Sequence, residues 1–194
     1  GERVLIHSAT GGVGLAALQI CREVGAEVFA TAGTAEKRDH LRKLGVRHVM
    51  DSRSLRFADE VLRDTGGEGV DVVLNSLAGE AIRKGLSVLR PYGRFVELGK
   101  RDLIEDAQLG LAPFRRNLSF HAVDLIPLTT LRPGKARKLM ERVAERIDDG
   151  TWRPIPTTSF DLAEAEAALR LMAQAKHVGK IVLTARGTSY PVHA

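Results

Sequence analysis

The amino-acid sequence predicts an α/β fold: a doubly wound parallel sheet of about six strands with helices on both faces. Two observations indicate this class. Short apolar segments of strand character alternate with amphipathic segments of helical period, and the unit repeats at roughly 20 to 25 residues. In addition, residues 70–75 (VDVVLN) form the continuous apolar run that is typical of a buried parallel strand. This repeat favours right-handed crossovers between parallel strands.

The first predicted elements alternate strand and helix. Residues 4–8 are a short apolar strand. Residues 12–24 form a helix with apolar side chains on most faces, so we expect it to be buried against the sheet. Residues 27–32 (EVFATA) predict a second strand. Residues 35–44 predict a helix that ends at Gly45, because glycine readily takes the left-handed conformation found at helix ends.

The middle of the chain continues the same alternation. Residues 48–51 predict the third strand, and residues 57–63 predict a helix that precedes a cluster of glycines. The apolar run 70–75 is the fourth strand, and residues 81–89 predict the helix that follows it.

Two further strands complete the predicted sheet. Pro91 and Gly93 predict a turn, and residues 94–98 (RFVEL) after it predict the fifth strand. Residues 117–123 (NLSFHAV) predict the sixth.

The last third of the chain predicts two helices and a strand. One helix begins at Pro133, has apolar residues at the helical period and ends at Gly150. Asp161 and Glu164 form the pattern of a capping box, which predicts the start of a second helix. Residues 181–184 predict a final strand.

These elements predict three parts. Residues 1–150 form the sheet domain, residues 151–186 add a helix and a strand that return toward a second domain, and residues 187–194 form a tail. Because the chain enters its first strand without any preceding segment, we expect it to be a piece of a longer protein.

Composition excludes several classes of protein. The 194 residues with 44% hydrophobic content suit one domain of ordinary core size, or one domain with a small appendage. The sequence contains neither an apolar run of about 18 residues nor a secretory signal pattern, so we expect no membrane contact and a cytoplasmic setting. Cys21 is the only cysteine and the six histidines are scattered, which predicts no metal site.

A glycine-rich turn lies between the first strand and the first helix. The stretch Ala9-Thr10-Gly11-Gly12-Val13-Gly14 matches the pattern G-x-G-x-x-G with alanine in the first position. In a Rossmann fold this turn lets the backbone approach a pyrophosphate, and the amides at the helix start bind the phosphates. We therefore expect a dinucleotide site here, although a merely tight turn would leave a similar pattern.

The end of the second strand indicates which dinucleotide binds. An acidic residue that would bond the ribose hydroxyls of NAD is missing there. Thr31 and Thr34 supply hydroxyls instead, and Lys37 and Arg38 follow in the next helix. Cations without a carboxylate suit a 2′-phosphate, so these residues predict NADPH, unless the two cations are ordinary solvated helix residues.

Six stretches of the chain closely resemble, in order, the enoyl reductase domains of polyketide synthases and of animal-type fatty acid synthase. These domains belong to the zinc-free branch of the medium-chain dehydrogenase/reductase superfamily. The stretches are LIHSATGGVGLAALQI, TAGTAEKRDHLRKLG, GVDVVLNSLAGE, GRFVELGKRDL, RRNLSFHAVDL and MAQAKHVGKIVLT. The resemblance implies NADPH-dependent reduction of the α,β double bond of an enoyl thioester on acyl carrier protein, within a multienzyme that makes polyketides or fatty acids.

The resemblance also implies roles for individual residues. Lys100, in the family's G-K-x-D pattern, corresponds to a proton donor, and Asp124 corresponds to its partner. An ammonium group beside a developing enolate stabilises it and can supply the proton. Without the family, Lys100 would equally be a surface lysine, and Asp124 a turn or cap residue.

Further cofactor contacts are expected at other strand ends. Asn75 and Ser76 end the fourth strand, where they are placed to contact the ribose or nicotinamide. In the resembled family, the backbone of Leu98 and Gly99 lies near the nicotinamide, and the segment 177–180, which contains Gly179, also lies close to the cofactor.

Other functions and partners follow from the same residues. A zinc-free NADPH-dependent quinone oxidoreductase is the alternative enzyme. The net charge of +5 suggests nucleic-acid binding as a third possible function. The basic residues are scattered and aromatic residues are few, so we expect no nucleic-acid partner. The family implies neighbouring domains of the same multienzyme and a separate amino-terminal substrate domain. The superfamily implies a homodimer through the sixth strand, residues 117–123.

Overall fold

The strands and helices follow the predicted alternation. The structure is a computed structural model that describes residues 1–185 of the chain. The strands are β1 (Arg3–Ile6), β2 (Glu27–Ala32), β3 (His48–Asp51), β4 (Val70–Asn75), β5 (Leu89–Glu97), β6 (Ser119–Ala122), β7 (Thr157–Asp161) and β8 (Lys180–Thr184). The helices are α1 (Gly12–Glu23), α2 (Ala35–Lys43), α3 (Phe57–Asp64), α4 (Glu80–Ser87), α5 (Arg101–Ile104), α6 (Leu125–Leu131), α7 (Pro133–Asp148) and α8 (Ala165–Ala173), with short 3₁₀ turns η1 (Ala112–Arg116) and η2 (Leu162–Glu164).

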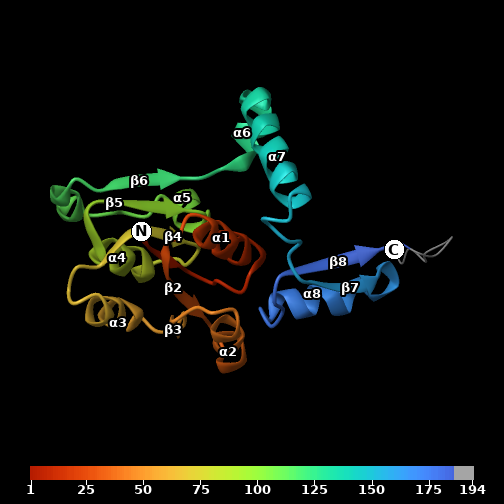
Figure 1. Ribbon diagram of the computed structural model, residues 1–194, viewed down its shortest axis with the longest axis horizontal. Coiled ribbons are helices and arrows are strands. Elements are labelled where there is room, and N and C mark those ends of the chain that lie inside the picture. The colour runs from red at the N-terminus through yellow and green to blue at the C-terminus, as the bar shows by residue number, and fades with distance from the viewer. Residues whose placement is uncertain (186–194) are drawn as a thin grey trace.

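Within residues 1–185, six strands form one parallel sheet in the order β3-β2-β1-β4-β5-β6, which we call the main sheet. Its strands lie side by side in Figure 1. The order reverses between β1 and β4, so the carboxyl ends of these two strands border a crevice. The predicted α/β, doubly wound fold is confirmed.

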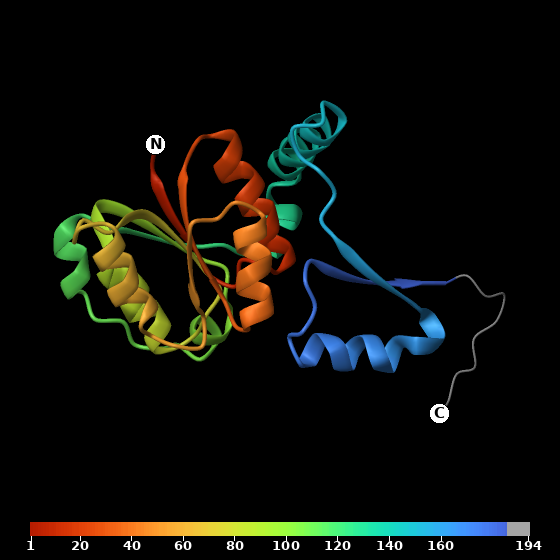
Figure 2. The ribbon, with the colours of Figure 1, turned by 60° about the horizontal axis from the view of Figure 1, so that its bottom comes forward.

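The main sheet is buried on both faces because neighbouring residues of each strand point to opposite sides. Leu5 and Phe29 belong to a buried cluster with side chains of α3 and α4. Ile6 and Ala30, the next residues along, belong to a second cluster with α1 and α2. Figure 2 shows the two helix pairs on opposite faces of the sheet. Runs such as residues 70–75 are therefore apolar almost throughout.

Strand β5 is longer than its sequence predicts. It starts at Leu89 and includes the residues expected to form a turn before it. The turn survives as an irregularity in the pairing with β4: Val70 pairs with Leu89, and Val72 already pairs with Arg94. Tyr92, inside this irregularity, has a φ of 64°. The prediction placed the break correctly but missed that pairing resumes on its other side.

The last part of the described chain forms a small unit of its own beside the main sheet (Figures 1 and 2). Strands β7 and β8 pair in parallel, and the predicted capping box of Asp161 and Glu164 is present at the start of η2. The sequence analysis missed β7, α5 and α6. Strand β7 was missed because its sequence, TTSFD, is mostly polar and exposed. The division at residue 150 stays a prediction, and the tail at 187–194 lies outside the described residues.

Helices α6 and α7 stand away from the main sheet (Figure 1). Several large apolar side chains on them are exposed, among them Ile126, Leu131 and Met140. No helix within residues 1–185 combines the length and the apolar character needed to cross a membrane.

Candidate functional site

The glycine-rich turn lies between β1 and α1, at the point where the strand order reverses. Gly11 is the residue before the first turn of α1, and its carbonyl accepts the N–H of Leu15 at 2.9 Å. Gly14 packs directly on the strand side, because a Cβ atom there would lie 2.5 Å from Cα of Ala9. The turn is therefore close-packed, as a dinucleotide-binding turn requires.

The start of α1 has properties that suit an anion. No side chain within residues 1–185 caps this end of the helix, and its first turn holds no acidic residue. The amides of Gly12, Val13 and Gly14 belong to the group at a helix start that has no partner inside the helix. Together with the helix dipole, they fit a phosphate group.

A lysine from the small unit that contains β7, α8 and β8, here called the carboxyl-terminal unit, reaches the same turn. The N–H of Gly179 donates to the carbonyl of Thr10 at 2.9 Å, which brings the start of β8 against the glycine turn. The side chain of Lys180 then crosses the start of α1, since a Cβ atom on Gly12 would lie 2.2 Å from Cε of Lys180. The resemblance already implied that the segment 177–180 lies close to the cofactor, but it gave Lys180 no role of its own. The tertiary structure adds that its side chain crosses the start of α1.

The two threonines predicted near the cofactor have partners inside the chain. Thr31 is buried, and its hydroxyl contacts Nδ1 of His7 at 3.0 Å and accepts the N–H of Ser8 at 3.3 Å. Thr34 caps α2, accepting the N–H of Lys37 at 3.3 Å. Both side chains order the end of β2, so any contact to a cofactor would come in addition to these bonds.

Lys37 lies beside a second cation, Arg53, at the carboxyl ends of β2 and β3. A Cβ atom on Gly33 would lie 3.2 Å from Nε of Arg53. Burial, and then the charge of Arg53, lower the pKa of Lys37, whose Nζ donates to the carbonyl of Ala175 at 2.7 Å. An anion that binds to both cations would offset their mutual repulsion.

Arg53 was not predicted, and Arg38 was. The guanidinium group of Arg38 donates to the carbonyl of Ala32 at 3.2 Å and pairs with Asp51 at 3.4 Å, so it already has acceptors within the chain. Arg53 lies two residues after the end of β3, and β3 lies beside β2 in the main sheet. Its place after the third predicted strand was the signal that could have identified it.

A cavity of about 340 Å³ continues from Arg53 along the strand ends. It lies between the turn after β3 and the start of α4. Its lining includes the apolar side chains of Leu55, Phe57 and Leu77 together with Arg53 and Arg101. Ser52, Ser54 and Glu80 also line it, so the cavity offers both apolar and polar groups to a ring that carries a phosphate.

Asn75 has its hydrogen-bond partners inside the chain, and its contact with the cofactor stays a prediction. It is fully buried, and its side-chain amide donates to the carbonyl of Leu77 and to the carboxylate of Glu97, both at 2.6 Å. Ser76, the next residue, is exposed at the strand end. Of the two residues predicted here, Asn75 shapes the turn and Ser76 faces outward.

The predicted catalytic residues lie in contact. Nζ of Lys100, after β5, lies 2.9 Å from Oδ1 of Asp124, after β6. Both side chains are about half exposed. The bond to Lys100, and then the N–H of Ile126 at the start of α6, lower the pKa of Asp124. Asp124 is thus both the partner of Lys100 and the cap of α6, two alternatives that the sequence left open.

The backbone of Leu98 and Gly99, just before Lys100, is fixed by hydrogen bonds. The N–H of Leu98 donates to the carbonyl of Asn75 at 2.9 Å, and the N–H of Gly99 donates to the carboxylate of Glu97 at 2.5 Å. The turn of Leu98 and Gly99 therefore has a fixed place next to Lys100.

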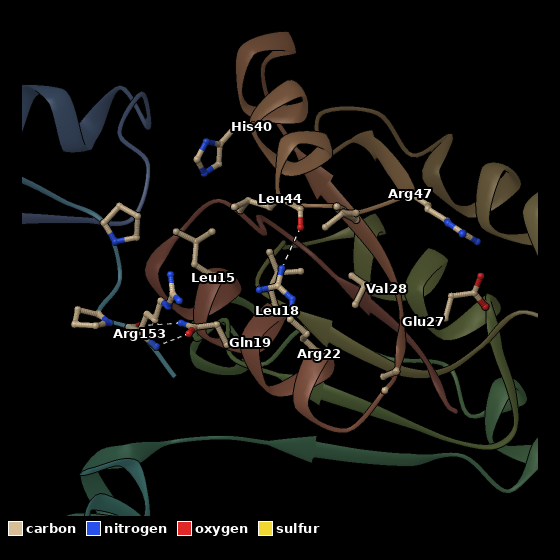
Figure 3. A pocket seen from close by; sticks show the side chains of 16 residues that line it. Leu15, Leu18, Gln19, Arg22, Glu27, Val28, His40, Leu44, Arg47 and Arg153 are labelled. Atoms are coloured by element: carbon tan, nitrogen blue, oxygen red, sulfur yellow. Dashed lines mark hydrogen bonds between the residues drawn. The ribbon is translucent and has the colours of Figure 1, made fainter. Parts of the chain in front are cut away.

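A larger cavity of about 810 Å³ lies apart from these strand ends (Figure 3). It opens between α1, the end of α2 and the segment before β7, and Leu15, Leu18 and Arg22 are among its lining residues. Gln19 exchanges two hydrogen bonds with the backbone of Arg153 at its edge, of 2.6 and 3.0 Å. Because the cavity reaches the amino ends of β2 and β3, it lies away from the crevice.

Comparison with protein families gives one match. Residues 44–183 match the family described as zinc-binding dehydrogenase. The residues do not fit a zinc site, however. Within residues 1–185, no group of three or more His, Cys, Asp or Glu side chains could hold a metal ion.

Among curated proteins, the chain is 53% identical over 184 residues to a component of the phenolphthiocerol/phthiocerol polyketide synthase of Mycobacterium tuberculosis. The match covers 95% of this chain but 8% of that protein. The chain therefore spans a small part of the relatives it matches.

Two solved structures narrow the comparison. The nucleotide-binding subdomain of the enoylreductase domain of PpsC from Mycobacterium tuberculosis is 54% identical, with a TM-score of 0.75, and the match covers 79% of this chain and 86% of that one. The CurK enoyl reductase is 44% identical, with a TM-score of 0.84, and the match covers 95% of this chain and 55% of that one.

Proposed function

Since this chain belongs to the zinc-binding dehydrogenase family and, within it, to the nucleotide-binding part of polyketide synthase enoyl reductase domains, we propose that it binds NADPH for the reduction of an enoyl thioester. The nicotinamide cofactor follows from the family, and the choice of NADPH is our inference. The observation that carries it is the pair of cations at this strand end: Arg53 lies beside Gly33, and its charge acts on Lys37.

The two ends of the cofactor would lie on opposite sides of the glycine turn. The amides of residues 12–14 and the ammonium group of Lys180 would bind the pyrophosphate. Lys37 and Arg53 would bind the 2′-phosphate, and the cavity beside Leu55 and Phe57 would hold the adenine ring. A carboxylate acceptor for the ribose hydroxyls of NADH is missing at the end of β2, so NADH would leave the two cations without an anion.

The nicotinamide end would lie over the turn of Leu98 and Gly99. When bound, NADPH supplies the hydride that adds to the β carbon of the substrate. Lys100 holds a proton on Nζ that can pass to the α carbon, and its positive charge stabilises the enolate that develops there. The carboxylate of Asp124, 2.9 Å away, keeps the ammonium group in place.

The remaining partners are proposals from the same relatives. We infer that the substrate is an enoyl thioester on acyl carrier protein and that neighbouring domains of a cytoplasmic multienzyme flank this chain. This chain spans 55% of the CurK enoyl reductase, so a further part of the domain would cover exposed residues such as Ile126 and Met140. A homodimer through the edge strand β6 is a further proposal, which light scattering would test.

Calorimetric titration with NADPH and NADH tests the cofactor. We expect the chain to bind NADPH at least tenfold more tightly, because a charged hydrogen bond contributes roughly 1.5 kcal/mol or more. Lys37→Ala and Arg53→Ala should each reduce this preference about tenfold, mainly by lowering the affinity for NADPH. Lys43→Ala, at the far end of α2, is the matched control and should leave the preference unchanged. Equal affinities of the unaltered chain for the two cofactors would contradict the assignment.

The reaction needs a separate experiment. The polypeptide that contains this chain should oxidise NADPH with an enoyl thioester and not with a quinone. The opposite result would favour the quinone oxidoreductase.

A further inference from the structure

Glu97 is a buried carboxylate that the proposed reaction does not use. It ends β5 and is 2% exposed. Burying a carboxylate is costly unless hydrogen-bond donors surround it. Its location is also specific, since the residues that follow it, Leu98, Gly99 and Lys100, form the proposed nicotinamide end of the site.

Both carboxylate oxygens of Glu97 accept hydrogen bonds from different segments. Oε2 accepts a hydrogen bond from the side-chain amide of Asn75, the last residue of β4, at 2.6 Å. Oε1 accepts the N–H of Gly99, after β5, at 2.5 Å. The main-chain carbonyl of Glu97 also accepts the N–H of Val123, the residue before Asp124, at 2.9 Å. Glu97 therefore joins the carboxyl ends of three neighbouring strands.

The hydrogen bonds of Asn75 fix the orientation of the amide that donates to Glu97. The amide of Asn75 also donates to the carbonyl of Leu77, and its oxygen accepts the N–H of Leu77 at 3.2 Å, so the amide cannot turn over without losing both bonds. Gly99 leaves room for the carboxylate of Glu97. A Cβ atom there would lie 2.8 Å from Oε1 of Glu97.

The charges around Glu97 agree with a supporting role. Lys100 pairs with Asp124 instead, and Asp102 uses its carboxylate to accept the N–H of Gly79. Burial raises the pKa of Glu97, the bonds from Asn75 and Gly99 oppose that rise, and the charge of Asp102 adds to it. The carboxylate thus depends on these two donors for its stability.

We propose that Glu97 is a positioning residue that fixes the turns after β4 and β5, and so places the Leu98–Gly99 backbone and Lys100 against the nicotinamide end of the cofactor. This inference rests on the proposed function. It predicts a selective effect, because β4 and β5 lie on one side of β1, whereas Lys37 and Arg53 lie on the side of β2 and β3. Loss of the carboxylate should therefore affect the nicotinamide half and spare the adenosine half.

The test compares two ligands by calorimetry on the chain and its Glu97→Gln variant. NADPH reaches both halves of the site, and adenosine 2′,5′-bisphosphate reaches only the adenosine half. Glutamine has nearly the same shape but one acceptor oxygen, so its amide would face either Gly99 or Asn75 as a second donor. We expect NADPH to bind about tenfold more weakly, and adenosine 2′,5′-bisphosphate to change less than about twofold.

A second variant keeps the carboxylate and moves it. Gly99→Ala should push Oε1 away from the turn and produce the same selective loss, so it decides the question if Glu97→Gln does not fold. Glu105→Gln, an exposed position near the same turn, is the control and should change neither affinity. An unaltered chain that binds neither ligand overturns the proposed function. Binding by the unaltered chain, with variants that weaken both ligands equally or neither, overturns the role of Glu97 alone.

Discussion

His7 is buried directly after β1 and takes part in the core rather than in the site. Its Nδ1 contacts the hydroxyl of Thr31 at 3.0 Å, and its ring meets the ring of Phe57 edge to face at 4.7 Å. Burial lowers the pKa of His7 from 6.5 to about 4. A proton on this ring would enter an apolar cluster that offers its Nε2 no acceptor within the described chain.

This burial predicts a pH dependence of stability. The unfolded chain binds a proton at His7 near pH 6.5, and the folded chain binds it near pH 4. The stabilisation is therefore complete above pH 6.5 and is lost as the pH falls toward 4, by about 3 kcal/mol at most. Urea unfolding at several pH values should show a shallower decline for His7→Asn than for the unaltered chain. His121→Asn, at an exposed position, should decline in parallel with the unaltered chain, and parallel curves for His7→Asn would refute the prediction.

The end of α4 shows how an element depends on a residue far along the chain. The last carbonyls of a helix have no donors within it. Here the guanidinium group of Arg116 donates to the carbonyl of Leu86 at 2.7 Å, and it also reaches Leu89, at the start of β5, at 2.6 Å. Its positive charge also suits the carboxyl end of the helix dipole. One side chain thus joins α4, β5 and η1.

Removing this side chain should destabilise the main sheet at its β5 side. We expect Arg116→Ala to lower the free energy of unfolding by about 2 kcal/mol, because charged hydrogen bonds to partly buried carbonyls are lost. Arg115→Ala changes the exposed neighbour in the same 3₁₀ turn and should change stability by less than about 0.5 kcal/mol. Equal effects of the two substitutions in urea unfolding would show that Arg116 contributes only surface charge.

At the scale of the whole molecule, the carboxyl-terminal unit packs against the strand ends of the main sheet and adds residues to the proposed site. It contacts the main domain through Gly179 at Thr10, through Ala175 at Lys37 and through Arg153 at Gln19. Two of these contacts lie at the predicted phosphate positions. Binding of the cofactor and docking of this unit should therefore be coupled.

Hydrogen exchange can measure this coupling. With NADPH bound, the backbone amides of residues 175–180 should exchange at least about fivefold more slowly, because each ordered contact suppresses local opening. The segment 165–169, at the start of α8 in the same unit, is an internal control and should change less. Equal protection of both segments, or of neither, would contradict a local coupling through the glycine turn.

The sequence by itself determined the α/β class, most strands and helices of the main sheet, and the glycine turn. Those features depend on the periodicity of apolar residues and on the position of glycines, and both can be read from residues that are close together in the sequence. It also placed Lys37 and brought Lys100 and Asp124 together through the resemblance. Only the tertiary structure decided that Arg53 lies beside Gly33, that the side chain of Lys180 crosses the start of α1 and that the amide of Asn75 bonds to Glu97. Those contacts join residues far apart in the chain, and no local pattern records which strand ends become neighbours.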